Sequence, residues 1–283
     1  MLLDLAAARV FYDGVDHAEG VAVHPDGSVW CGGEAGQVYR IAPDGSAMEL
    51  RAQSSGGFTL ALAFGPDGRL YYVDVALRAL LRLDPSGGDP VTLFEGAIDG
   101  HELRIPNAIA FDGAGNLYLT ESWSPTEPGP GVYRIDPDGH GELWSSGPFL
   151  FANGVAVAPD DSAVYVAETW SRRIARVPVL EGGAAGSPET YAELPGTLPD
   201  GLGIGSDGLL YIACYQPSQV MRVSERREPE ILVRDDDAMV LAHPTNIAFR
   251  GQTAFCANLG RWHITAVELA DPGVAGGGDG RRT

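Results

Sequence analysis

Short runs of apolar residues alternate with tight polar turns along the whole chain. A turn of the Pro-Asp-Gly type follows most of these runs, and a second apolar run begins directly after the turn. Apolar strands on either side of such turns are typical of β-hairpins. Helical periodicity is absent, because Pro, Gly and Asp interrupt the chain roughly every dozen residues. The pattern therefore predicts an all-β fold.

The hairpin recurs six times at nearly constant spacing. Its copies begin at Gly20, Ala61, Ala108, Gly154, Gly201 and Asn246. The intervals between these starts are 41, 47, 46, 47 and 45 residues, which is the length of a four-stranded propeller blade. A third strand and a looser fourth strand follow in most copies. We therefore predict a six-bladed β-propeller.

The two ends of the chain differ in composition. Residues 7–12, AARVFY, look like a strand without a nearby hairpin partner, and we predict that they supply the outer strand of the last blade. No linker divides the chain, so we expect one propeller domain over residues 1–270. The tail over residues 271–283 is Gly-rich and polar, and we expect it to be disordered.

One position in each copy carries candidate chemistry. The innermost strand of a propeller blade lines the central channel, so the residues just before the six copies should form a ring at one face. In order they are Glu19, Leu60, Asn107, Asn153, Asp200 and Thr245. Two carboxylates and two amides make a poor core but suit a hard cation. The ring has no His or Cys, so we expect Ca²⁺ first, with Mg²⁺, Mn²⁺ or Zn²⁺ as alternatives.

Turn formation is the competing interpretation of this ring. Asn153-Gly154 and Asp200-Gly201 are common turn dipeptides. Turn preference does not explain why Glu19, a poor turn former, has the same register. We therefore interpret the ring as a metal site, in which Gly154 lets the backbone bend so that the Asn153 amide oxygen points inward.

The net charge and the types of charged and cysteine residues limit the classes of binding partner and mechanism. The 283 residues include 38 acidic and 19 basic side chains, a formal net charge of −19, which disfavours nucleic acid and anionic membranes. All the basic residues are Arg, so lysine nucleophiles are excluded. Three cysteines without CxxC spacing argue against a disulfide framework or a zinc site, and no export signal is evident. We expect a cytoplasmic monomer or weak homodimer that acts on a small molecule.

Segments near the ring supply candidates for substrate binding. These candidates are Asn107, Arg104, His17, Phe151, Glu121 and His243. Arg104 could bind a carboxylate or an oxyanion through two hydrogen bonds, and the histidines could transfer protons near neutral pH. A surface arginine and hydrogen-bonded loop histidines are the alternative interpretations. The proline-containing loop 122–131 is the expected lid.

Four segments carry a family resemblance. They are HAEGVAVHPDGSVW around Glu19, RIPNAIAFDGAGNLY around Asn107, FANGVAVAPDDSAVYVAET around Asn153 and PDGLGIGSDGLLYIACY around Asp200. With them the chain resembles the SMP-30/gluconolactonase/LRE-like (regucalcin) family of six-bladed propellers, which hold a divalent cation in the channel. The resemblance implies that Glu19, Asn153 and Asp200 bind the metal, and that Asn107 faces the metal or the substrate.

The resemblance also implies an activity. Family members are mostly lactonases acting on sugar lactones, and relatives include phosphotriesterases and metal-free strictosidine synthases. The ligand set argues against the last branch. The chain has Asn107-Ala108 where many members have Asn-Asp, and EGVAV where many have EGP and a Trp, so the sugar-acid specificity stays open.

These inferences predict a metal-dependent lactonase. The metal would polarise the lactone carbonyl and stabilise the oxyanion formed when water attacks. We expect Asp200 to be the general base, with Glu19 as the second candidate. No GxSxG serine motif is present. Two alternatives stay open: phosphotriester hydrolysis at the same metal, and a metal-binding or ligand-binding propeller without turnover.

Overall fold

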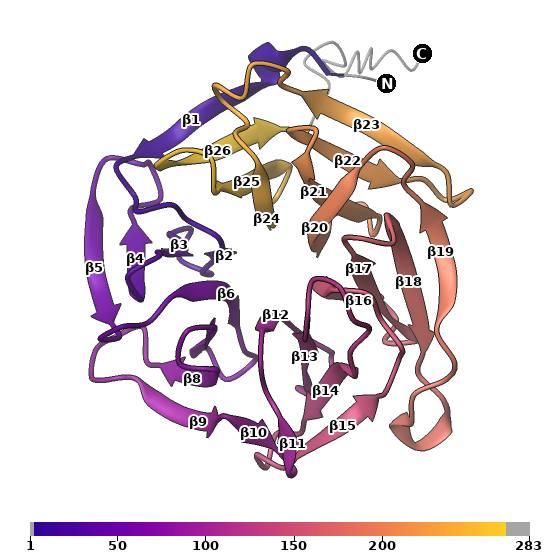
Figure 1. Ribbon diagram of the computed structural model, residues 1–283. Coiled ribbons are helices and arrows are strands. Elements are labelled where there is room, and N and C mark those ends of the chain that lie inside the picture. The colour runs from indigo at the N-terminus through magenta and orange to yellow at the C-terminus, as the bar shows by residue number, and fades with distance from the viewer. Residues whose placement is uncertain (1–2, 270–283) are drawn as a thin grey trace, which may run out of the picture.

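The computed structural model describes residues 3–269. Six four-stranded antiparallel sheets surround a central axis (Figure 1), which confirms the predicted six-bladed propeller. The tail that we expect to be disordered, residues 271–283, lies outside the described residues. The described helical segments are two 3-10 turns, η1 (Leu5–Ala7) and η2 (Glu181–Gly183), and neither is long or apolar enough to cross a membrane.

Each blade runs outward from the axis through four strands. The innermost strands are β2 (Val21–Val23), β6 (Thr59–Phe64), β12 (Pro106–Phe111), β16 (Ala152–Val157), β20 (Leu198–Ile204) and β24 (Pro244–Arg250). The second strands are β3 (Val29–Gly32), β7 (Leu70–Asp74), β13 (Leu117–Glu121), β17 (Ala163–Glu168), β21 (Leu210–Gln216) and β25 (Thr253–Asn258). Blades 1 to 6 are numbered in this order.

The outer half of each blade has the same order. The third strands are β4 (Gln37–Ile41), β8 (Ala79–Leu83), β14 (Gly131–Ile135), β18 (Arg173–Pro178), β22 (Gln219–Val223) and β26 (His263–Glu268). The outermost strands are β5 (Met48–Gln53), β9 (Val91–Glu95), β15 (Gly141–Ser145), β19 (Glu189–Glu193), β23 (Pro229–Arg234) and β1 (Ala8–Asp13). A small hairpin, β10 (Ala97–Ile98) and β11 (His101–Glu102), links blades 2 and 3.

The N-terminal strand closes the ring, as the sequence predicts. Strand β1 pairs antiparallel with β26 and completes blade 6, with Arg9 opposite Ala266. The buried Phe11 ring meets the Phe255 ring edge-on, with 4.9 Å between the ring centroids. Because the last blade contains both ends of the fold, this packing resists opening of the ring.

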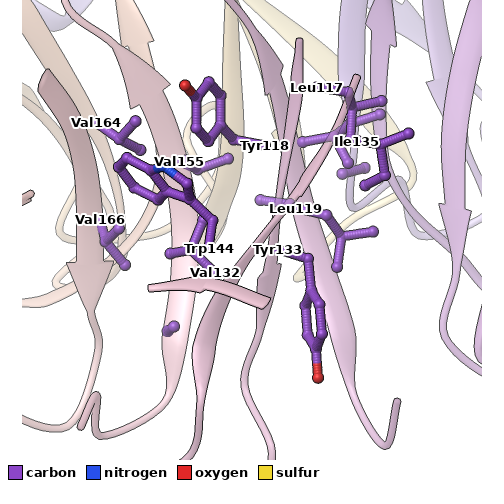
Figure 2. Close-up of a cluster of buried hydrophobic side chains, with 14 of the residues drawn as sticks. Leu117, Tyr118, Leu119, Val132, Tyr133, Ile135, Trp144, Val155, Val164 and Val166 are labelled. Carbon is purple, nitrogen blue, oxygen red and sulfur yellow. The ribbon is translucent and has the colours of Figure 1, made fainter. Parts of the chain in front are cut away.

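Apolar side chains fill the space between neighbouring blades. Figure 2 shows this packing where blade 3 meets blade 4: Trp144 of β15 lies beside Val155 of β16 and Val164 of β17. Burial of each such side chain contributes about 1.5–3 kcal/mol. The three cysteines are also buried and unbonded in second strands, so they act as small apolar residues.

Strand pairing becomes irregular at the ring residues. The register between first and second strands skips two residues in each of four blades: Leu60-Ala61, Asn107-Ala108, Asn153-Gly154 and Asp200-Gly201. Such β-bulges change the direction in which a side chain points and are common beside functional sites. The irregularity therefore marks the ring position itself, including Leu60 and Thr245, and does not distinguish the candidate ligands from the other ring residues.

The Asn153-Gly154 pair does not form a turn. Both residues lie inside strand β16, and Gly154 is not among the residues with positive φ. A Cβ at Gly154 would clash with the Asp200 carbonyl oxygen and with the Cα of Gly201. Gly154 is thus needed because two inner strands approach closely there, which corrects the expectation that it lets the backbone bend.

Candidate functional site

Glu19 and Asp200 come together although they belong to different blades. Glu19 precedes β2 of blade 1, and Asp200 lies in β20 of blade 5. Burial raises the pKa of Asp200 well above its ordinary value, and the Glu19 charge raises it further, while the Asn153 amide acts in the opposite direction. Blade 6 separates the two blades around the ring. Their carboxylates therefore interact across the channel.

The Glu19 carboxyl has a similarly perturbed environment. Burial raises its pKa to about 7, and the nearby Glu34 charge also raises it. The carboxyls of Glu19 and Asp200 therefore ionise less readily than ordinary acids. When both are ionised, they repel each other. A cation between them would relieve that repulsion.

Asn153 presents its amide with a fixed orientation. Its side chain is buried, and Nδ2 donates to Thr169 Oγ1 over 3.1 Å. The Thr169 hydroxyl donates in turn to the Pro199 carbonyl over 2.8 Å. A hydroxyl has one proton, so Thr169 must accept from the NH₂ end of the amide. The Oδ1 atom of Asn153 is therefore the end left without a donor among residues 3–269.

Asn107 repeats this arrangement one blade earlier. Its Nδ2 donates to Ser122 Oγ over 3.1 Å, and Ser122 donates to the Ala152 carbonyl over 2.7 Å. The hydroxyl proton is again committed to a backbone carbonyl. Asn107 Oδ1 is thus available to a ligand in the same way as Asn153 Oδ1.

The two remaining ring positions carry neither a carboxylate nor an amide. Leu60 is apolar and buried. Thr245 is buried, and its hydroxyl donates to the Glu19 backbone carbonyl over 2.7 Å. The ring therefore provides two carboxylates and two amide oxygens, a donor set that suits Ca²⁺ or another hard cation.

Beyond the ring most of the side chains that line the channel are apolar, and Asn246 is a polar exception. A cavity of about 380 Å³ is lined by the inner strands of all six blades, with Phe64, Phe111 and Phe249 among its walls. Leaving a charged or hydroxyl-rich molecule unpaired against such walls is unfavourable.

His17 lies in an acidic cluster at the face that carries the ring residues. Its Nε2 accepts a hydrogen bond from the Trp262 indole over 2.6 Å, and its Nδ1 lies 3.2 Å from Glu34 and 3.6 Å from Asp16. Indole nitrogen only donates, so the His17 proton must be on Nδ1, facing the carboxylates. Potential ligand atoms of Asp16, His17 and Glu34 all lie within 4.8 Å of one another.

Three of the residues predicted to bind substrate share an uncommon backbone conformation. They lie at the channel entrance on the face of the ring residues, which we call the mouth. His17, Phe151 and His243 have φ values of 35°, 60° and 53°, and each stands two positions before a ring residue. Left-handed φ at bulky residues is rare and concentrates at functional sites. Phe151 packs near exposed Trp170, with 5.9 Å between ring centroids. His243 stacks on Tyr215 and makes a 2.8 Å hydrogen bond from Nδ1 to the Tyr215 carbonyl.

Arg104 and Glu121 have contacts that differ from those expected of substrate-binding groups. The Arg104 guanidinium lies 3.6 Å from the centroid of the Trp123 ring and donates to Glu102 over 3.0 Å. Glu121 is fully buried, and its oxygens accept three backbone N–H bonds, from Arg104, Ile105 and Trp123. These contacts hold the loop that precedes β12. Glu121 stays a predicted substrate-binding residue, and in the structure its buried carboxylate is occupied by these backbone donors.

Sequence reasoning missed Ser122 and Thr169. Both directly follow a buried glutamate at the end of a second strand, in the segments ESW and ETW. The sequence does contain a signal for them. Blades 3 and 4 are the two blades with Asn in the ring, and the hydroxyl residue follows that Asn by 15 residues in blade 3 and 16 in blade 4. The sequence does not show that each hydroxyl contacts a backbone carbonyl of the next blade, and this contact is what indicates a role for Ser122 and Thr169.

Comparison with known proteins identifies a family model and several similar lactonases. The family model for the SMP-30/gluconolactonase/LRE-like region matches residues 90–255. A 6-deoxy-6-sulfogluconolactonase of Pseudomonas putida is 26% identical over 266 residues, covering 87% of this chain and 84% of the relative. The lactonase drp35 of Staphylococcus epidermidis is 27% identical over 237 residues, covering 79% of this chain and 72% of the relative.

A solved structure shows the same fold. A gluconolactonase of Xanthomonas campestris superimposes with a TM-score of 0.78 at 21% identity, covering 93% of this chain and 89% of that one.

Proposed function

Because this chain belongs to the SMP-30/gluconolactonase/LRE-like family, as the match over more than half its length shows, we propose that it is a divalent-cation-dependent lactonase. The curated relatives named above carry lactonase names, which supports this reaction class. Its substrate would be a small lactone of the sugar type or a related one, and Ca²⁺ is the cation that we propose.

One observation carries the proposal. The Glu19 charge raises the pKa of Asp200, and the amide oxygens of Asn153 and Asn107 have no hydrogen-bond donor among residues 3–269. A purely structural ring would not place repelling carboxylates at a narrow axis. Glu19, Asn153 and Asp200 would hold the cation, and Asn107 would face the cation or the substrate.

The chain's own groups account for the remaining chemistry. When bound, the cation would act as a Lewis acid toward the lactone carbonyl. Water attacks the carbonyl carbon, the ring C–O bond breaks, and a hydroxy acid forms. Asp200 is the proposed base that accepts the proton from the attacking water, because this carboxylate would stand beside both the cation and the incoming water. Glu19 is the second candidate for this role.

The mouth would bind and enclose the substrate. Phe151 and Trp170 provide an apolar wall, and His17 and His243 offer imidazole groups whose tautomers are fixed by their partners. Arg104 is tied to Trp123 at the base of loop 122–131, so we propose that it positions this loop. Closure of such a loop would exclude bulk water.

The experiment combines metal analysis with a lactone screen. The purified protein is analysed for bound metal and assayed on a lactone panel with a pH indicator, with and without EDTA, beside Asp200→Ala. Turnover that stops with EDTA, returns with Ca²⁺ and is lost in the variant supports the proposal. Turnover that survives both treatments would falsify the metal mechanism. Bound metal without hydrolysis of any lactone would instead favour a binding propeller, and phosphotriester hydrolysis alone would favour the other enzyme class.

A further inference from the structure

Two hydroxyl groups connect the ring residues of three successive blades. Asn107 donates to Ser122, which donates to the carbonyl of Ala152, the residue directly before Asn153. Asn153 donates to Thr169, which donates to the carbonyl of Pro199, the residue directly before Asp200. Each hydroxyl therefore joins the amide of one ring residue to the backbone that carries the next.

We propose that Thr169 is a positioning residue for the cation site, and that it acts through Asn153 and Asp200 together. The inference rests on the proposed function, since it concerns the cation that this ring would hold. Thr169 never needs to touch the cation or the substrate. Its hydroxyl turns the Asn153 amide so that Oδ1 is the free end, and it also holds the backbone that carries Asp200.

Burial makes this arrangement specific. Thr169 and Asn153 are 5% and 6% exposed, so water cannot readily replace a lost hydrogen bond. Without the hydroxyl, the amide could rotate by half a turn and present NH₂ where the oxygen stands, and an NH₂ group cannot bind a cation. Loss of residues that orient metal ligands typically weakens metal affinity about 10–100-fold.

The chain contains a matched control outside the ring, in the second and third strands of blade 6. Asn258 donates from Nδ2 to Thr265 Oγ1 over 2.9 Å, and Thr265 donates to the Val240 carbonyl. Asn258 and Thr265 are both fully buried, so the same Asn–Thr–carbonyl arrangement recurs there, and Asn258 Nδ2 also donates to the carbonyls of Cys256 and His263. Asn258 Oδ1, however, accepts the backbone N–H of Ala242 and is not free for a ligand.

The test measures Ca²⁺ affinity by calorimetry, and melting temperature with and without Ca²⁺, for the full-length protein and its variants. Thr169→Val should weaken Ca²⁺ binding about 10–100-fold, while Thr169→Ser, which keeps the hydroxyl, should stay within about threefold of the wild type. Thr265→Val should lower the melting temperature and leave Ca²⁺ affinity unchanged. If Thr169→Val does not fold, Thr169→Ala gives the same comparison.

A double-mutant cycle completes the test. In an Asn153→Ala background, Thr169→Val should weaken binding clearly less than it does alone, because the amide that it positions is absent. Wild-type affinity in Thr169→Val, or an equal loss in Thr265→Val, would overturn the inference while leaving the metal site intact. Failure of the wild type to bind Ca²⁺ would instead overturn the proposed function and this inference with it.

Discussion

The hydroxyl of Thr245 donates a 2.7 Å hydrogen bond to the backbone carbonyl of Glu19, across the seam where blade 6 meets blade 1. The two residues are 226 positions apart in the sequence. This bond fixes the backbone of a candidate cation ligand by a contact that exists only when the ring is closed. Closure of the propeller and assembly of the site are therefore linked.

Replacement of Thr245 tests that link. Thr245→Val keeps the shape but leaves the Glu19 carbonyl without its partner, which should lower the free energy of unfolding by about 1–3 kcal/mol. For a protein of this size each kcal/mol corresponds to a fall in melting temperature of about 2–4 °C. Calorimetric melting measures the effect, and Thr245→Ser should restore most of it. An unchanged melting temperature in Thr245→Val would show that the bond does not contribute.

Phe11 offers a second test of closure. Its ring is buried against Phe255 in the blade that contains both ends of the fold. Phe11→Ala should cost about 3–5 kcal/mol, as is typical for a buried aromatic side chain. Denaturant titration gives this value directly. Arg9→Ala, an exposed change in the same strand, should cost far less, and similar losses from both variants would argue against specific packing at the seam.

Much of this fold could be predicted from the sequence because the same hairpin pattern occurs six times. Each copy alone is a weak indication of a blade, but six copies at a nearly constant spacing indicate a propeller. The hairpin pattern gave the blades, and the unpaired segment before Gly20 gave the closing strand, which the structure places at Ala8–Asp13. The register of Glu19, Asn153 and Asp200 followed from the same alignment. Each of these conclusions depends on the local pattern of apolar and turn residues and on the spacing of the repeats. Both can be read from a single sequence.

What could not be predicted depends on how neighbouring blades pack. The pair Asn153-Gly154 has turn chemistry, yet it lies in a strand because close approach of the Asp200 backbone requires glycine there. Glu121 is predicted as a group at the mouth, and its burial against three backbone donors could not be read from the sequence. The role of Thr169 needs a carbonyl from the next blade. Local sequence does not contain these distances.

Stability of the metal-free protein should depend on pH near neutrality. The pKa of Glu19 is raised from 4.5 to about 7 in the folded state, so the folded protein holds this proton more tightly than the unfolded chain. The resulting stabilisation is fully present below pH 4.5 and is lost as the pH rises through 7. The melting temperature in EDTA should therefore fall over this range. Glu19→Gln should flatten the profile, and an identical profile in that variant would assign the effect elsewhere.

The loop after β13 should become more mobile when its stacking contact is removed. Arg104 lies over the Trp123 ring at 3.6 Å, and Trp123 has a φ of 64°. Trp123→Ala removes the cation–π contact, worth about 0.5–2 kcal/mol, and should increase both hydrogen exchange and proteolytic cleavage within residues 122–131. Trp170→Ala, at the corresponding place in the next blade, serves as the control. Equal exchange in Trp123→Ala and the wild type would contradict a positioning role for Arg104.

Asp200→Asn should separate stability from function. The substitution keeps the size of the side chain and removes one of two carboxylates that repel each other across the channel, so the metal-free protein should melt at a higher temperature than the wild type. Cation binding loses a charged ligand and the reaction loses its proposed base, so turnover should fall by about 10²-fold or more. Asp138→Asn, at an exposed turn, makes the same change of charge away from the channel and should alter neither quantity appreciably. A lower melting temperature for Asp200→Asn in EDTA would mean that the carboxylate stabilises the empty ring, which would contradict a site built to hold a cation.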